Sequence, residues 1–120
     1  MTAINLKGKV GEYNAVVLLK SRGYKIIRTN FYSKFGEIDI IAEKNGHIYF
    51  CEVKTRWSIK YGLPEESVSK FKLNKIRKTI DFYMFSNRIS NTKLHILVIS
   101  QLLNYKNSMI QKIIEVDRAP

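Results

Sequence analysis

The chain has 120 residues, 45% of them hydrophobic, which is enough to bury a core and excludes intrinsic disorder as the default state. Lysine and arginine total 21 against 10 acidic residues. The resulting net charge of +11 favours a polyanionic partner such as nucleic acid, without separating DNA from RNA or from an anionic membrane. The single cysteine excludes an internal disulfide, and we expect a soluble, cytoplasmic protein because neither a signal peptide nor a membrane-spanning run is recognisable.

The first half of the chain is predicted to form one helix and three strands. Residues 8–22 have the pattern of a helix, and Gly23 ends it because glycine readily adopts the left-handed conformation that follows a helix. A first strand is predicted over residues 24–30. Two more strands, over residues 37–43 and 47–54, are rich in β-branched and aromatic residues.

The second half is predicted to contain a long helix and two strands. The helix runs from about residue 65 to residue 85, with Glu65 and Glu66 at its positively polarised N-terminus. Its core-facing stripe, at helical spacing, consists of Leu73, Ile76, Ile80 and Tyr83. Strands follow over residues 94–100 and 110–116. This order indicates a single α/β domain over the whole chain, with a central mixed sheet and a right-handed crossover through the second helix to a parallel strand.

The two central strands are joined by Asn45-Gly46, the dipeptide most typical of a two-residue hairpin turn. With such a turn, the numbers of opposed residues sum to 91. Asp39 then lies opposite Glu52, and Glu37 lies opposite Lys54, all on one face of the sheet. Opposed like charges destabilise a sheet by a few tenths to ~1 kcal/mol, so the two acids need a reason to be there.

A divalent cation would resolve the repulsion between Asp39 and Glu52, because Mg²⁺ is bound through one or two carboxylates and several waters. The alternative is a solvated strand face on which both acids are simply hydrated. The same face also carries Ile41, Ile48 and Phe50, so it should pack against a helix, where unpaired acids are costly. The pattern therefore favours Asp39 and Glu52 as ligands of Mg²⁺ or Mn²⁺.

Two further charged residues complete the predicted site. Lys54 would polarise the attacking water or stabilise the charge that builds on a phosphate, and we expect Glu37 to orient it through an ion pair. An ion pair with Glu37 and no catalytic role is the alternative. Glu12 shares a helix face with Ala15 and Leu19 and would reach a metal-bound water, unless it is only a charge favoured near a helix N-terminus.

Several short motifs stand in the order and at the separations of a known protein family. They are Gly11-Glu12, Gly23-Tyr24, Gly36-Glu37-Ile38-Asp39 and Glu52-Val53-Lys54-Thr55-Arg56. Over about residues 8–76 they resemble the YraN-like family of small bacterial proteins, which is similar to Holliday-junction resolvases and other nucleases of the Asp…Glu-x-Lys type. Two places depart from the family pattern: Leu73 stands where a glutamine is expected, and Leu94-His95-Ile96 stands where the fourth strand often carries an aspartate.

The resemblance implies a restriction-endonuclease-like fold and metal-dependent hydrolysis of phosphodiester bonds. It implies that Asp39 and Glu52 are the metal ligands, that Lys54 is the catalytic lysine, and that Glu12 is a helix acid that completes the catalytic set. Arg56 also matches the pattern, and we expect it to contact a phosphate.

The predicted function is that of a Mg²⁺-dependent endonuclease acting on DNA, with branched DNA in repair or recombination as a candidate substrate. Basic residues predicted to grip the nucleic acid are Arg56, Lys60, Lys70, Lys72, Arg77 and Lys78. Two alternatives remain. One is a non-catalytic module that binds branched DNA or structured RNA, and the other is an interaction protein that docks its basic face on a larger nucleic-acid machine. No membrane partner is expected, and a junction-cutting role would favour a homodimer.

Overall fold

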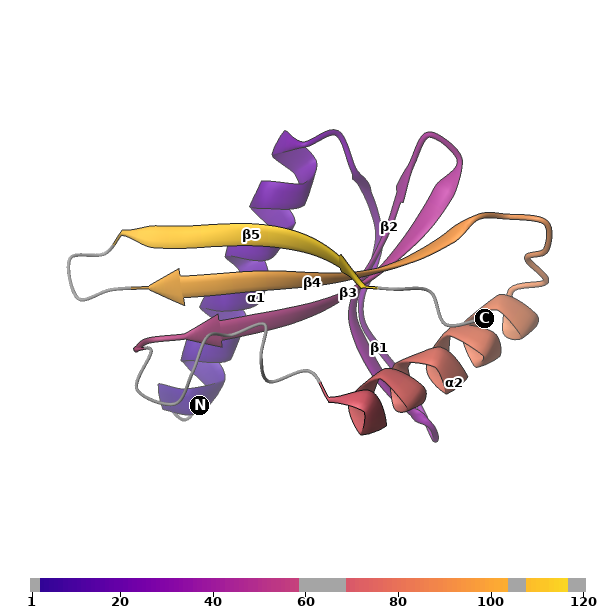
Figure 1. Ribbon diagram of the computed structural model, residues 1–120, viewed down its shortest axis with the longest axis horizontal. Coiled ribbons are helices and arrows are strands. Elements are labelled where there is room, and N and C mark those ends of the chain that lie inside the picture. The colour runs from indigo at the N-terminus through magenta and orange to yellow at the C-terminus, as the bar shows by residue number, and fades with distance from the viewer. Residues whose placement is uncertain (1–2, 59–68, 104–107, 117–120) are drawn as a thin grey trace.

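The protein is a mixed α/β structure in which one five-stranded sheet is packed against two helices (Figure 1). The computed structural model describes residues 3–58, 69–103 and 108–116. Its elements are α1 (Ala3–Ser21), β1 (Lys25–Ser33), β2 (Gly36–Lys44), β3 (His47–Arg56), α2 (Lys70–Ser86), β4 (Leu94–Leu103) and β5 (Met109–Val116). Strands lie in the order β1-β2-β3-β4-β5, and all neighbours are antiparallel except the parallel pair β3 and β4. Within the described ranges, neither helix is long and apolar enough to cross a membrane.

The two helices cover opposite faces of the sheet. Ala15 and Leu19 of α1 are fully buried against a cluster that includes Ile40 and Cys51. On the other face, Ile76, Ile80 and Tyr83 of α2 pack with the alternate strand residues Ile41, Ile48 and Phe50. The predicted helix stripe and the predicted apolar strand face are therefore both confirmed, and they pack against each other.

Both helices begin at different residues from those predicted. Helix α1 starts at Ala3 and continues through Gly8, because one glycine weakens a helix by only about 1 kcal/mol and does not have to end it. Helix α2 starts at Lys70, because the extended residue Ser69 caps it and accepts a hydrogen bond from the Lys72 N–H at 3.2 Å. Glu65 and Glu66 thus do not belong to α2, and they lie outside the described residues.

The predicted end of the first helix and the predicted hairpin are both confirmed. Gly23 has φ +88°, and the N–H of Tyr24 donates to the Leu19 carbonyl at 3.0 Å, as in a Schellman motif. Asn45 and Gly46 have φ values of +53° and +78°, which fit a two-residue turn with left-handed residues at both positions.

Pairing between β2 and β3 has the predicted register but ends early. The paired residues run from Lys44 with His47 to Ile40 with Cys51, all with numbers that sum to 91. Beyond this point the Asp39 side chain, at Oδ2, accepts a hydrogen bond from the Val53 N–H at 2.7 Å. The two strands therefore separate just before Asp39 and Glu52 would form the next pair, and this fork positions the candidate site.

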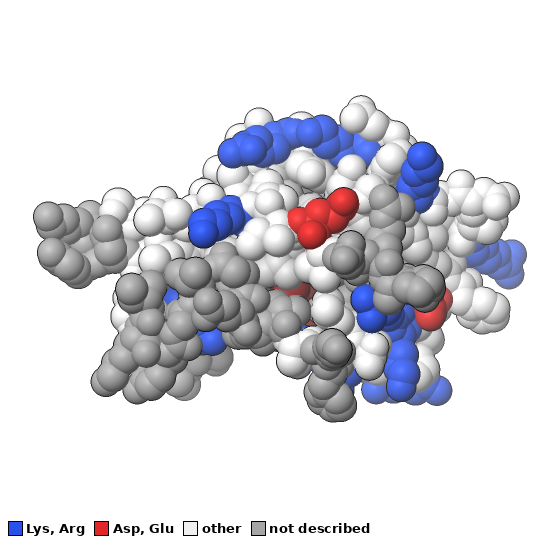
Figure 2. All heavy atoms as spheres, in the orientation of Figure 1, with Lys and Arg blue, Asp and Glu red and all other residues white. Residues whose placement is uncertain are grey.

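Positive charge is dispersed over the molecule. On the face shown in Figure 2, lysine and arginine side chains lie around the margins and do not form one patch. Exposed examples stand on separate elements, such as Lys20 on α1, Lys25 on β1, Lys78 on α2 and Lys112 on β5. The net charge thus provides a broadly positive surface and does not by itself locate a binding site.

Candidate active site

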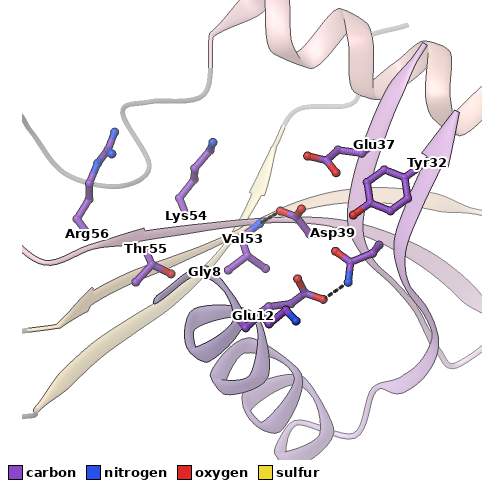
Figure 3. Close-up of a pocket in the computed structure, with 11 residues that line it drawn as sticks. Gly8, Glu12, Tyr32, Glu37, Asp39, Val53, Lys54, Thr55 and Arg56 are labelled. Carbon is purple, nitrogen blue, oxygen red and sulfur yellow. Dashed lines mark hydrogen bonds between the residues drawn. The ribbon is translucent and has the colours of Figure 1, made fainter. Parts of the chain in front are cut away.

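A pocket of about 650 Å³ occupies the fork between β2 and β3. Its walls come from four elements and consist of Gly8, Lys9 and Glu12 of α1, Asn30 and Tyr32 of β1, Glu37 and Asp39 of β2, and Val53, Lys54, Thr55 and Arg56 of β3. The carboxyl groups of Glu12, Glu37 and Asp39 are turned into this space (Figure 3). The pocket thus gathers Glu12, Asp39 and Lys54, three of the four predicted catalytic residues.

Asp39 stands in the most unfavourable electrostatic surroundings of the site. Burial raises the pKa of its carboxyl from 3.8 to about 7, and the charges of Glu52, Glu37 and Glu12 act in the same direction. The hydrogen bond from the Val53 N–H opposes them, because it stabilises the ionised form. Near neutral pH this carboxyl is therefore close to half protonated, and a nearby cation would restore its charge.

Glu52 is buried on the α2 side of β3, with only 8% of its side chain exposed. Its Oε1 lies 3.3 Å from the Lys54 Nζ and 2.5 Å from the Lys72 Nζ. Lys54 is thus paired with Glu52, whereas we had expected Glu37 as its partner. The expectation failed because it assumed that the ladder continues past Ile40, where the strands in fact separate.

The pKa values of the two lysines beside Glu52 are shifted in opposite directions. Burial lowers the pKa of Lys54, and the neighbouring Lys72 acts in the same direction while Glu52 opposes it. Burial also acts to lower the pKa of Lys72, but its contact with Glu52 outweighs this effect and the pKa is raised. Lys54, which lines the pocket, is therefore the group better suited to exchange a proton.

Glu12 is fixed on the sheet-facing side of α1 as predicted. Its Oε1 accepts a hydrogen bond from the Asn30 Nδ2 at 2.7 Å, and Asn30 has φ +53°, which interrupts the regular geometry of β1. The backbone conformation of Asn30 thus turns its amide toward the acid. No sequence pattern predicts this role of Asn30, apart from the tolerance of asparagine for left-handed backbone angles.

A close contact holds α1 against β3 beside Glu12. At Gly11, a Cβ atom would lie 2.4 Å from the Thr55 Oγ1, so only glycine allows this approach. The fully buried Gln101 donates to the Gly11 carbonyl at 2.8 Å and to the Thr55 Oγ1 at 3.0 Å, while Gln111 donates to the Gln101 Oε1 at 2.7 Å. Sequence reasoning included Gly11 in a motif but missed the two glutamines, which are far away along the chain.

Only some of the basic residues predicted to bind nucleic acid lie near the pocket. Arg56 lines the pocket, and its Nε is buried without a hydrogen-bond partner in the part of the chain that the structure describes. Lys72 is half-buried and pairs with Glu52. Arg77 donates to the Asn74 Oδ1 at 3.4 Å, and Lys78 is exposed. Lys60 and the side chain of Lys70 lie outside what the structure describes.

A second polar cluster lies outside the pocket, across β3, β4 and β5. The His47 Nδ1 is 2.8 Å from the His95 Nε2, and the His95 Nδ1 contacts the Glu115 carboxylate. The two imidazoles are nearly parallel at 8°, with centroids 5.0 Å apart, so the short N···N contact is an in-plane hydrogen bond and not ring stacking. His95, in the segment that departs from the family pattern, is thus a buried residue of the sheet.

The donor chemistry of the fork fits a divalent cation bound mainly through water. Carboxylate oxygens are the preferred ligands of Mg²⁺, and four of the 10 acids in this basic chain influence one another around Asp39. Within the described residues, no three acids, histidines or cysteines already stand at metal-binding spacing. The arrangement thus suits Mg²⁺, which needs only one or two carboxylates, better than a metal that requires a complete protein cage.

Comparison with known proteins shows that the chain is similar to members of one protein family. The sequence model described as "Uncharacterised protein family UPF0102" matches residues 11–101. A UPF0102 protein of Persephonella marina is 46% identical over 82% of this chain and 85% of its own length. A UPF0102 protein of Clostridium novyi is 41% identical over 90% of this chain and 91% of its own length. One of Caldanaerobacter subterraneus is 39% identical over 94% of this chain and 94% of its own length. The likeness thus extends over almost the whole chain.

Proposed function

The chain belongs to the uncharacterised protein family UPF0102, a name that assigns no activity, and we propose that it is a Mg²⁺-dependent endonuclease that hydrolyses DNA phosphodiester bonds. The observation that carries the proposal is the meeting of Glu12, Asp39 and Lys54 in one pocket, with Glu52 paired to Lys54 beside it. A mixed sheet whose central strands supply two acids and a lysine is also compatible with the restriction-endonuclease-like fold, which we propose as its fold family.

In this mechanism Asp39 and Glu52 would hold Mg²⁺, which when bound lowers the pKa of a coordinated water and neutralises charge on the scissile phosphate. Lys54 stabilises the negative charge that develops on the phosphate oxygens, from its position on the wall of the pocket. Glu12, held in place by Asn30, accepts a hydrogen bond from the attacking water. Arg56, which lines the pocket, contacts a neighbouring phosphate through its guanidinium group.

The rim of the pocket favours DNA with unpaired bases. Tyr32 lines the pocket and is 66% exposed, so its ring is free to stack on a base that is not held in a duplex. Branched or flapped DNA presents such bases next to a backbone that the pocket can admit. We therefore extend the proposal to structure-specific cleavage, as in DNA repair or recombination by resolvase-like nucleases.

One observation favours a second function, that of a non-catalytic nucleic-acid-binding module. Glu52 is already neutralised by two lysines, and Asp39 already accepts a backbone hydrogen bond. The negative charge of the two acids is thus partly compensated by groups of the protein itself. This alternative retains the Arg56 and Tyr32 contacts but predicts no cleavage.

A cleavage assay on a panel of substrates distinguishes the two functions. Duplex, single-stranded, flapped and four-way DNA are incubated with Mg²⁺, Mn²⁺ or chelator, and cleavage is expected only with metal and mainly on the flapped and four-way substrates. Lys54→Met should reduce the rate by roughly 100-fold or more while DNA binding is retained. The matched control is Lys93→Met, at an exposed lysine remote from the pocket. Binding without cleavage on every substrate would establish the non-catalytic module instead.

A further inference from the structure

We propose that Lys72 is an internal counter-ion of Glu52, which a divalent cation must displace before Glu52 can serve as its ligand. The inference rests on the proposed function, because it concerns the same metal site. Its starting point is the contact between α2 and β3, where the Lys72 Nζ lies 2.5 Å from the Glu52 Oε1. A role of this kind differs from the DNA contact that the sequence predicted for Lys72.

The first argument is that the ammonium and the cation exclude each other at Glu52. A carboxylate that is only 8% exposed has few directions from which a cation can approach, and Lys72 occupies one of them at contact distance. Lys54 occupies a second direction, at 3.3 Å from the same oxygen. A divalent ion bound there would stand within a few ångströms of both ammonium groups and repel them, so one of the two must move away.

The second argument identifies Lys72 as the lysine that moves. Its side chain is 37% exposed, whereas that of Lys54 is 23% exposed. Lys72 therefore reaches water with less rearrangement. Lys72 also comes from the first turn of α2, so it can turn away without disturbing β3, whereas Lys54 is two residues beyond Glu52 on the same strand. Lys54 thus stays beside the pocket when the cation binds.

The arrangement has a consequence for the order of binding. Without metal, Lys72 and Lys54 together compensate the charge of the buried Glu52 carboxylate, and Lys72 makes the shorter contact. With metal, the released ammonium is available to a DNA phosphate. Metal and DNA should therefore strengthen each other's binding, because each stabilises the state in which Lys72 has left Glu52.

Metal affinity without DNA tests the proposal. Isothermal titration with Mn²⁺ compares the full chain with its Lys72→Met and Lys93→Met variants. Lys72→Met should bind Mn²⁺ roughly tenfold more tightly than the unmodified protein, within the range of typical coupling effects, and Lys93→Met should be unchanged. Equal or weaker binding by Lys72→Met would overturn the role of Lys72 and leave the metal site intact. Absence of Mn²⁺ binding by all three proteins would instead overturn the proposed function.

A second measurement follows Lys72 in the unmodified protein and uses a conservative variant only to assign its signal. Lysines of the unmodified protein are methylated reductively with ¹³C, and the Lys72 signal, assigned with Lys72→Arg, is followed while Mn²⁺-free Mg²⁺ is added. The signal should move toward that of an exposed lysine as the metal binds. A Lys72 signal that stays in place while the Lys54 signal responds to Mg²⁺ would contradict displacement.

Discussion

Among single residues, Asp39 has the least favourable electrostatic surroundings of the site. Its carboxyl is largely buried, the charges of three other acids raise its pKa, and the hydrogen bond from the Val53 N–H stabilises its ionised form. The pKa of about 7 in the folded protein exceeds the ordinary value of 3.8. Folding therefore disfavours the ionised form. The penalty is absent below about pH 4, grows as the pH rises through this interval, and is complete above pH 7.

Replacement of Asp39 by asparagine should thus stabilise the metal-free protein. The amide oxygen still accepts the hydrogen bond from the Val53 N–H, but the charge that burial disfavours is gone. We expect Asp39→Asn to raise the free energy of unfolding by roughly 2 kcal/mol at pH 8, with a difference that vanishes toward pH 4. Thermal unfolding with chelator measures both values. A variant less stable than the unmodified protein at pH 8 would contradict this account, and added Mg²⁺ should raise the melting temperature of the unmodified protein alone.

At the scale of elements, the position of α1 depends on one close approach. Gly11 allows the helix to lie against Thr55, and the buried Gln101 joins the two by hydrogen bonds. This contact sets the depth of Glu12 in the pocket, because Glu12 is the next residue of the helix. Gly8, in the same helix, has no atom within 4 Å of where its Cβ would lie.

Replacement of these two glycines by alanine should change the stability of the protein in opposite directions. Gly8→Ala is expected to stabilise the protein by about 0.5–1 kcal/mol, because alanine favours the helix and meets nothing. Gly11→Ala should destabilise it by about 1–3 kcal/mol, because the helix must move away from Thr55. Urea unfolding of the two variants provides the comparison. Similar effects from both would show that α1 does not approach β3 this closely.

Elements that depend on local sequence patterns could be predicted from the sequence, whereas the contacts between distant elements could not. The Asn45-Gly46 turn alone determined the register of β2 and β3 as far as Ile40 and Cys51. The fork beyond it depends on the Asp39 side chain and the Val53 N–H, which no local pattern predicts. In the same way, the candidate acids and Lys54 were identified from spacing. The pairing of Lys72 with Glu52 depends on how α2 crosses β3, so sequence spacing could not predict it.

The whole molecule combines a surplus of positive charge with a local surplus of acids. Its net charge of +11 comes from lysines and arginines on many elements, while Glu12, Glu37, Asp39 and Glu52 influence one another at one fork. In the proposed function, the net positive charge would attract a polyanion to the surface as a whole, and the acids at the fork would favour a cation there.

Binding of DNA should depend steeply on salt. With about five phosphate contacts, the affinity is expected to fall with a slope of about −4 to −5 in a plot of log K against log salt concentration. Fluorescence anisotropy with Asp39→Asn, which binds without cutting, measures this slope between about 50 and 200 mM salt. Arg56→Met in the same background should reduce its magnitude by about one. A slope near zero would exclude the basic surface as the source of affinity.

In the proposed function, the separation of β2 from β3 would also make activity depend on complete folding. Glu12 belongs to α1, on one face of the sheet, and lines the pocket. Lys72 belongs to α2, on the other face, and pairs with Glu52. Both helices therefore contribute charged groups near the fork. A newly made chain with only one helix docked would hold an incomplete set of these groups. Cleavage would therefore be confined to fully folded copies, and genomic DNA would be protected from half-formed ones.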